Sequence, residues 1–133
     1  VSVHKITKYM KESYAGPLFK KEVDAISSVI KDKKEPVTCI VGGSKISTKI
    51  NVVMNLIKNV NNIIIVGAMA NNFLTFKGFK VGKSLVEHGT EKIIDGIYTE
   101  ADKHRCNIII PEDCKVSDSF DGDGIIKKQT YII

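Results

Sequence analysis

The residues best placed to do chemistry are two adjacent glycines followed by two lysines that stand four positions apart. Gly42 and Gly43 end a short apolar run, and Lys45 and Lys49 follow within a predicted helix. Glycine lets backbone N–H groups approach a ligand closely, and the start of a helix attracts phosphate. Positions four apart share one helix face, so both ammonium groups are expected to project to the same side. The pattern is typical of a site for a chain of phosphates.

The residues alone leave that interpretation and a simpler one equally open. Lysines four positions apart also occur by chance on helices whose charged face only meets water. A second glycine turn, at Gly67 and Ala68, carries no charge. Its small residues either admit a flat apolar ring at a sheet edge or let a strand pack closely on a helix, and the second use is favoured.

Hydrophobic patterning predicts the elements that position these turns. Short β-rich runs at 37–41, 63–66 and 107–110 are typical of strands that are buried on both faces. Apolar residues at helical spacing predict helices at 17–30, 46–57, 69–76 and 90–104. This alternation indicates a parallel sheet with right-handed crossovers, in which both glycine turns lie at the carboxyl edge, where ligands bind in open α/β folds.

Two of the predicted helices carry a clear apolar stripe. Phe19, Val23 and Ile26 recur at helical spacing in the first helix, and we expect this stripe to be buried. In the last helix, Ile94 and its neighbours one and two turns later, Ile97 and Ala101, are expected to face inward. The tail from 114 onward contains a turn cluster at 121–124 and ends in an apolar patch at 131–133.

Length and composition limit the remaining possibilities. The chain has 133 residues, 43% of them hydrophobic and 26% charged, as in one ordinary soluble domain. No run of about 18 apolar residues predicts a membrane-spanning helix, so no membrane partner is expected. The formal net charge is +5, but the lysines are scattered, and the chain has no Trp. The composition therefore disfavours nucleic acid and favours a small anionic ligand or a solvated surface.

Outside the glycine turns, the sequence predicts no second site and no metal site. Cys39, Cys106 and Cys114 have no metal-like spacing, and we expect small buried hydrophobes in a reducing cytosol. The three histidines are far apart and are expected on the surface. The segment 78–84 resembles a P-loop, but three residues separate its glycines instead of four, and it follows a helix. No obvious general base is present, which fits phosphoryl transfer and equally fits no catalysis.

Five segments resemble motifs of phosphoglycerate kinases. GGSKISTKI at 42–50 resembles the family signature GGAKVSDKI, and AGPLFKKEV at 15–23 resembles AGFLMEKEL at the start of that family's interlobe helix. IIVGAMANNFL at 64–74 resembles IIGGGMAYTFL. VGKSL at 81–85 resembles IGTSL, and IPED at 110–113 resembles LPVD. Each match alone is weak, but their common order and spacing make the resemblance specific.

The resemblance implies an α/β fold, a three-layer, Rossmann-like parallel sheet that is an incomplete half of the family's nucleotide-binding lobe. It implies reversible transfer of the γ-phosphoryl of Mg-ATP to 3-phosphoglycerate in glycolysis, giving ADP and 1,3-bisphosphoglycerate. By position, Lys49 would hold nucleotide phosphates. Lys45 would be catalytic, following the transferring phosphoryl group and stabilising its charge. The adenosine pocket would be lined by Gly42, Gly43, Ser44, Gly67, Ala68 and Leu85.

Two of these positions depart from the family pattern. Ala68 replaces a glycine, so a methyl group is expected to intrude near the adenine. Ser44 replaces an alanine, a change between small residues that we expect the site to tolerate.

The resemblance also divides the chain into three parts. Residues 1–16 would be a remnant of the 3-phosphoglycerate lobe, 17–35 the hinge helix bearing Glu22, and 36–133 part of the nucleotide-binding lobe. The sugar-acid site, the Mg²⁺ ligands and later motifs resembling DIGP, WNGP and GGGDT are expected outside this chain. We therefore expect an inactive fragment of a cytoplasmic, monomeric enzyme. The alternative is a non-catalytic nucleotide-binding module.

Overall fold

The computed structural model describes residues 5–31, 34–119 and 124–130. The chain divides into two compact units, residues 1–34 and residues 35–133, and each unit is considered by itself. The predicted division into three parts, with boundaries after residues 16 and 35, stays a prediction. No helix in the described part of the chain is both long and apolar enough to cross a membrane.

The first unit contains a short 3-10 helix, η1 (Ile6–Tyr9), and the helix α1 (Pro17–Lys31). A proline occupies the first position of α1, where its missing N–H costs no hydrogen bond. The predicted apolar stripe of α1 is exposed, with 65% of Phe19 and 64% of Ile26 open to solvent. The prediction that the stripe is buried is therefore wrong for these residues. The physical reason is that no residue from 5 to 28 is buried, so the stripe meets no core.

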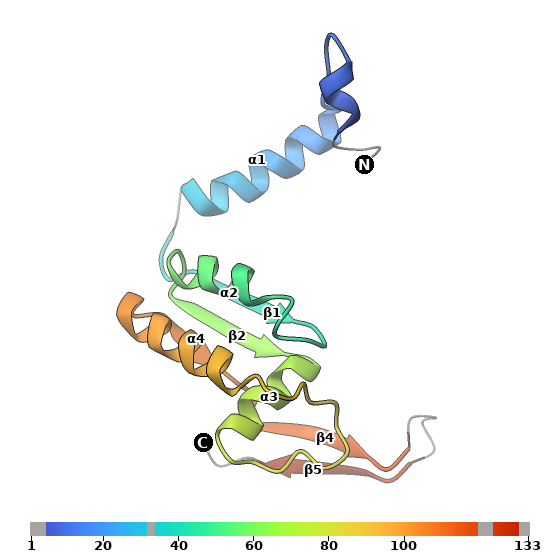
Figure 1. Ribbon diagram of the computed structural model, residues 1–133, viewed down its shortest axis with the longest axis vertical. Helices are drawn as coiled ribbons and strands as arrows, with labels where there is room; N and C mark the ends of the chain where they lie inside the picture. The colour runs from blue at the N-terminus through green and yellow to red at the C-terminus, as the bar shows by residue number, and fades with distance from the viewer. Residues whose placement is uncertain (1–4, 32–33, 120–123, 131–133) are drawn as a thin grey trace. The chain divides into compact units, whose positions relative to one another are not determined.

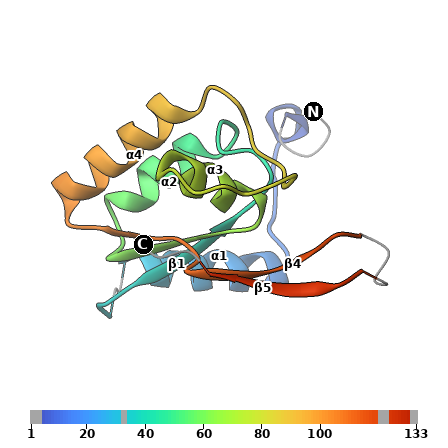
Figure 2. The same ribbon diagram turned by 90° about the horizontal axis from the view of Figure 1, so that it is seen from below.

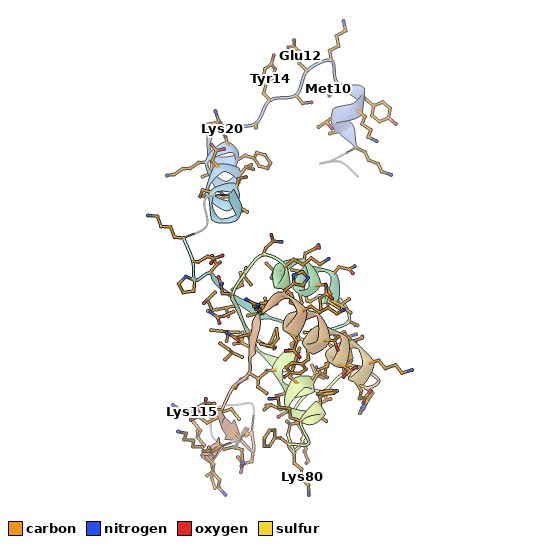
Figure 3. The ribbon with its side chains drawn as sticks, turned by 90° about the vertical axis from the view of Figure 1, so that its left-hand side faces the viewer. Met10, Glu12, Tyr14, Lys20, Lys80 and Lys115 are labelled. Carbon is orange, nitrogen blue, oxygen red and sulfur yellow. The ribbon has the colours of Figure 1, made fainter. Side chains whose placement is uncertain are left out.

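Polar residues of the first unit lie on its surface. The Tyr14 hydroxyl donates a hydrogen bond to the Glu12 carboxylate, and both residues are labelled in Figure 3. That hydrogen bond raises the pKa of Tyr14 above its ordinary value. Glu22, predicted to lie on the hinge helix, is exposed on α1.

The second unit alternates strands and helices before it ends in a hairpin (Figure 1). Strands β1, β2 and β3 form a parallel sheet in that order. The predicted α/β fold with a parallel sheet is confirmed. In chain order, the elements are β1 (Thr38–Gly42), α2 (Ile50–Ile57), β2 (Asn62–Val66), α3 (Ala68–Phe76), α4 (Glu91–His104), β3 (Asn107–Ile109), β4 (Asp113–Ser117) and β5 (Ile126–Thr130).

The core of the second unit lies between the sheet and helices α2, α3 and α4, which cover the same face of the sheet (Figure 2). Ile63 and Ile65 point from the central strand into this layer and are fully buried. Val53 and Ile57 on α2 and Phe73 on α3 pack against them and are also buried to 1% exposure or less. The alternation of buried and half-buried residues along β2 follows from the two-residue period of a strand.

Helix α4 follows its sequence prediction closely. Ile94, Ile97 and Ala101 are buried in the core, so the predicted inward face is confirmed. The helix ends at Arg105, whose φ of 54° is left-handed, a common way to terminate a helix. The next N–H, of Cys106, donates to the Ala101 carbonyl at 2.9 Å, and the chain then enters β3.

The second face of the sheet is open to solvent. Ile40, Ile64 and Ile109 pair across the three strands and form one row on that face. Ile40 is 70% exposed and Ile109 is 43% exposed, whereas Ile64 is half-buried. The prediction that these strands are buried on both faces is wrong here. The described residues of 35–133 place helices on only one side, so they supply two layers of the predicted three.

Strands β4 and β5 form an antiparallel hairpin that the sequence did not predict. The Lys128 ammonium and the Asp113 carboxylate form an ion pair across it, with the two atoms 2.6 Å apart. The hairpin escapes prediction because β5 reads IKKQT and is exposed at every position, so no buried alternation marks it. The predicted apolar patch at 131–133, and the predicted turn at 121–124 except Gly124, lie outside the described residues.

Candidate functional site

The carboxyl edge of the sheet brings the two glycine turns into direct contact. Gly42 ends β1 beside Val66, the last residue of β2. The N–H of Met69 donates to the carbonyl of Gly43 at 2.8 Å, which joins the start of α3 to the first turn. The prediction that both turns share this edge therefore holds in the structure. Their contact is backbone to backbone, as the close-packing interpretation of the second turn expects.

Gly67 has a conformation that only glycine adopts readily. Its φ of 70° and ψ of −164° lie in a region that is essentially confined to glycine. A Cβ atom at this position would lie 3.2 Å from the Gly43 carbonyl oxygen and 3.3 Å from the Gly43 nitrogen. The backbones of the two turns can therefore approach this closely only because Gly67 has no side chain.

The first lysine does not lie on a helix, which corrects the sequence prediction. Helix α2 begins at Ile50, and residues 44–49 form a turn that precedes it. Ile46 anchors this turn because it is fully buried, and its carbonyl accepts a hydrogen bond from the N–H of Lys49 at 2.9 Å. Lys45 stands on the exposed part of the turn. The two lysines therefore do not share one helix face.

The Lys49 side chain lies beside the first glycine turn. Lys49 is the N-cap residue of α2, and its Cε is 3.9 Å from where a Cβ of Gly43 would lie. The Lys49 side chain is exposed, so its ammonium group can reach a ligand. The first N–H groups of α2 have no partner within the helix, which is general for helix starts. At α3, by contrast, the Met69 N–H is already bonded to Gly43.

The other predicted site residues surround this edge at different depths. Ser44 is exposed directly after the glycines, and Ala68 is half-buried as the first residue of α3. Leu85 lies in the segment 77–90 between α3 and α4 and is 59% exposed. The Asn71 side-chain amide donates to the Leu85 carbonyl at 3.0 Å and ties that segment to α3.

Sequence reasoning missed two residues that organise the site, Glu87 and Asn72. The Glu87 carboxylate accepts hydrogen bonds from the backbone N–H of Ser47, at 3.2 Å, and from the Ser47 hydroxyl. The Asn72 side-chain oxygen accepts a hydrogen bond from the Glu87 N–H at 2.7 Å. Glu87 and Ser47 stand 40 positions apart, so no local pattern indicates their contact. Asn72 lies in the segment 64–74 that resembles the family, but its role is visible only in the fold.

The hydrogen bonds to Glu87 also shift its titration. The Ser47 hydroxyl has the largest effect, and together with the Ser47 N–H and the positive charge of Lys45 it lowers the pKa of the Glu87 carboxyl below 4.5. Because the pKa is lowered, the stabilisation that this contact contributes is fully present above about pH 4.5. It is lost as the pH falls through the lowered pKa. At neutral pH the carboxylate is ionised and accepts both hydrogen bonds.

The remaining chemistry-bearing residues form no second site in the described part of the chain. No group of three or more His, Cys, Asp or Glu among the described residues could hold a metal ion. Cys106 is buried as predicted, and burial raises the pKa of its thiol, whereas Cys39 and Cys114 are only half-buried. Lys20 projects from α1, Lys115 from β4 and Lys80 from the segment between α3 and α4 (Figure 3), which agrees with the scattered charge in the sequence.

These observations define an open, parallel α/β protein whose candidate anion site lies at the carboxyl edge of its sheet. A family model described as "Phosphoglycerate kinase" matches residues 1–132. The chain therefore belongs to the phosphoglycerate kinase family, as the sequence motifs predict.

Individual relatives agree with this assignment. The phosphoglycerate kinase of Wolbachia pipientis wMel is 39% identical over 132 residues, which are 99% of this chain and 33% of that protein. That of Zymomonas mobilis is 41% identical over 108 residues, 81% of this chain and 27% of that protein. The structure of phosphoglycerate kinase from Coxiella burnetii superposes with a TM-score of 0.83 at 33% identity, covering 94% of this chain and 33% of that one. The chain thus spans about a third of the length of these relatives.

Proposed function

We propose that this chain carries part of the ATP/ADP site of a phosphoglycerate kinase, the enzyme that transfers a phosphoryl group reversibly between ATP and 3-phosphoglycerate in glycolysis. The observation that carries the proposal is the position of Lys49, whose side chain runs beside Gly43 at the start of α2. A flexible cation, a turn without side chains and a helix start together suit a chain of phosphates. Transfer from ATP to 3-phosphoglycerate gives ADP and 1,3-bisphosphoglycerate.

Each residue of the edge has a proposed part in nucleotide binding. Lys49 holds the phosphates, and Lys45 stabilises the charge of the phosphoryl group during its transfer. The adenosine would lie against the two glycine turns and the segment around Leu85, which Asn71 ties to α3. Gly42, Ser44 and Gly67 are exposed, so this edge is accessible to a ligand. The half-buried Ala68 methyl group would reduce the space for the adenosine.

The Mg²⁺ that accompanies ATP is not expected to have its protein ligands among the described residues. They contain no cluster of three or more side chains that could hold a metal ion. From the family likeness and the covered length, we infer that these ligands and the 3-phosphoglycerate site belong to other parts of the enzyme. We infer a cytoplasmic location and a monomeric full enzyme on the same basis.

Replacing Lys49 by methionine is expected to weaken ADP binding by about 1.5–3 kcal/mol, roughly 10–150-fold, because a charged hydrogen bond to phosphate is lost. Methionine keeps the length of the side chain and removes its charge. Equilibrium binding of fluorescent ADP to the 133-residue chain measures the change. Lys58→Met is the matched control, because Lys58 is exposed at the other end of α2 and should leave affinity unchanged. Unchanged ADP affinity in Lys49→Met would remove Lys49 from the site.

The 133-residue chain alone is expected to show no phosphoglycerate kinase turnover. Phosphoryl transfer requires both substrates to be held in line, and this chain spans only about a third of its relatives. A coupled assay of ADP formation from ATP and 3-phosphoglycerate tests this, with the intact Wolbachia relative as the positive control. Turnover of the chain above the rate of a Lys45→Ala, Lys49→Met double variant would contradict the prediction.

A further inference from the structure

We propose that Glu87 is a positioning residue that holds the turn between β1 and α2 in the shape that binds phosphate. The inference rests on the proposed nucleotide site. Glu87 comes from the segment between α3 and α4, yet both oxygens of its carboxylate contact the same turn residue. One oxygen accepts from the backbone N–H of Ser47 at 3.2 Å, and the other accepts from the Ser47 hydroxyl. A two-point contact of this kind restrains both position and orientation.

Glu87 can restrain the turn because it is itself held by buried groups. Its N–H donates to the side-chain oxygen of Asn72 at 2.7 Å, and its carbonyl accepts from the Thr90 hydroxyl at 3.1 Å. Asn72 is 2% exposed and Thr90 is 5% exposed. The Asn72 side-chain amide in turn donates to the Met69 carbonyl at 3.3 Å within α3. The carboxylate therefore stands on a rigid support and not on a freely moving loop.

The contacts hold the chain between β1 and α2 to α3 at two points. At the first point, the Met69 N–H donates directly to the Gly43 carbonyl at 2.8 Å. At the second point, Ser47 is linked through Glu87 to Asn72, one helical turn further along α3. Lys45 lies between these two points. A turn that is ordered before the ligand arrives does not lose that freedom on binding, so its affinity for phosphate is higher.

Charge also indicates a positioning role for this carboxylate. A carboxylate repels phosphate, so Glu87 does not suit direct contact with the ligand, and its oxygens instead accept hydrogen bonds from Ser47. The positive charge of Lys45 also acts on Glu87. In the proposed role, Glu87 holds Ser47 and the turn in place and does not contact the ligand.

The first test measures the turn itself, without nucleotide. In the 133-residue chain, Glu87→Gln loses the negative charge and one acceptor, so the backbone N–H of Ser47 is expected to exchange with solvent about tenfold faster in NMR measurements. Glu91→Gln is the matched control, since Glu91 is an exposed carboxylate at the start of α4 and its loss should leave Ser47 exchange unchanged. Ser47 exchange that is the same in Glu87→Gln and in the unmodified chain would overturn the proposal.

The second test measures the consequence for binding. Glu87→Gln is expected to raise the dissociation constant for ADP about 3–10-fold and to leave that for adenosine within about twofold, because the turn meets the phosphates. Ser47→Ala keeps the backbone hydrogen bond and loses only the hydroxyl, so its effect on ADP should be smaller. A general loss of structure would weaken both ligands alike, and that result would overturn the positioning role.

The two tests separate this inference from the proposed function. If the unmodified chain fails to bind ADP while Ser47 exchange responds to Glu87→Gln, the proposed nucleotide site is wrong, and the role of Glu87 in phosphate binding falls with it. If ADP binds with equal affinity to the unmodified chain and to Glu87→Gln, the nucleotide site stands and the positioning role is overturned.

Discussion

Replacing Phe73 by alanine is expected to lower the free energy of unfolding by about 3–5 kcal/mol, which is typical for a buried aromatic ring. Phe73 lies on α3 and is fully buried between the helices and the sheet. Its ring centroid is 5.9 Å from that of Tyr98, at an interplanar angle of 76°, which is a favourable edge-to-face pair. Alanine would remove the pair and leave a cavity. Urea unfolding followed by circular dichroism measures the loss, since the chain has no Trp for fluorescence.

Phe76 is the matched control for this change. It lies on the same helix and contacts the same tyrosine, with ring centroids 6.0 Å apart in a stacked arrangement, but it is 38% exposed. Phe76→Ala should therefore cost less, about 1–2 kcal/mol, because less apolar area is lost and solvent can fill the space. Equal losses for the two variants would show that the buried layer around Phe73 does not carry the stability of the fold.

Replacing Gly67 by alanine is expected to lower the free energy of unfolding by about 1–3 kcal/mol and to weaken ADP binding about tenfold. The first effect arises because a side chain is strained at a φ of 70° with a ψ of −164°. The second arises because the new methyl group would press on the backbone of Gly43, from 3.2 Å away, and displace the turn that we propose binds the phosphates. Urea unfolding and fluorescent ADP binding measure the two effects separately.

Gly78→Ala distinguishes strain from crowding. Gly78 has a φ of 88°, but no atom would lie within 4 Å of a Cβ at that position. This variant should therefore lower the free energy of unfolding through backbone strain and leave ADP affinity unchanged. A Gly67→Ala variant that binds ADP as well as Gly78→Ala does would refute the view that close contact between the two glycine turns shapes the site.

The sequence was sufficient for the family, the parallel sheet and most of the elements. Helix α4 illustrates why, since Ile94, Ile97 and Ala101 recur with the period of a helix and are all buried. In this helix, the spacing of apolar residues alone indicates which face packs against the core. The glycine turns were also recognisable, because strand ends in a parallel sheet share one edge. The ligand roles assigned to the site residues stay a prediction.

Tertiary structure alone decided where the helix after the first glycine turn begins. Helical spacing of Ile46 with later residues predicts a helix from that position, but Ile46 is buried as the anchor of a turn, and the helix starts at Ile50. A buried residue reports a contact with the core and not the backbone conformation that makes the contact. Helix α1 is the opposite case, because its backbone conformation was predicted but its apolar stripe is exposed.

By itself, the sequence determined the inward face of α4, because burial imposes a period on the chain that local patterning can detect. Only the tertiary structure decided which residues that are far apart in the sequence come into contact. Ser47 and Glu87 stand 40 positions apart, and the contact between Gly43 and Gly67 depends on the register of β1 against β2. Such contacts follow from how the elements pack, and packing is a property of the whole sheet and its helices that no single segment encodes.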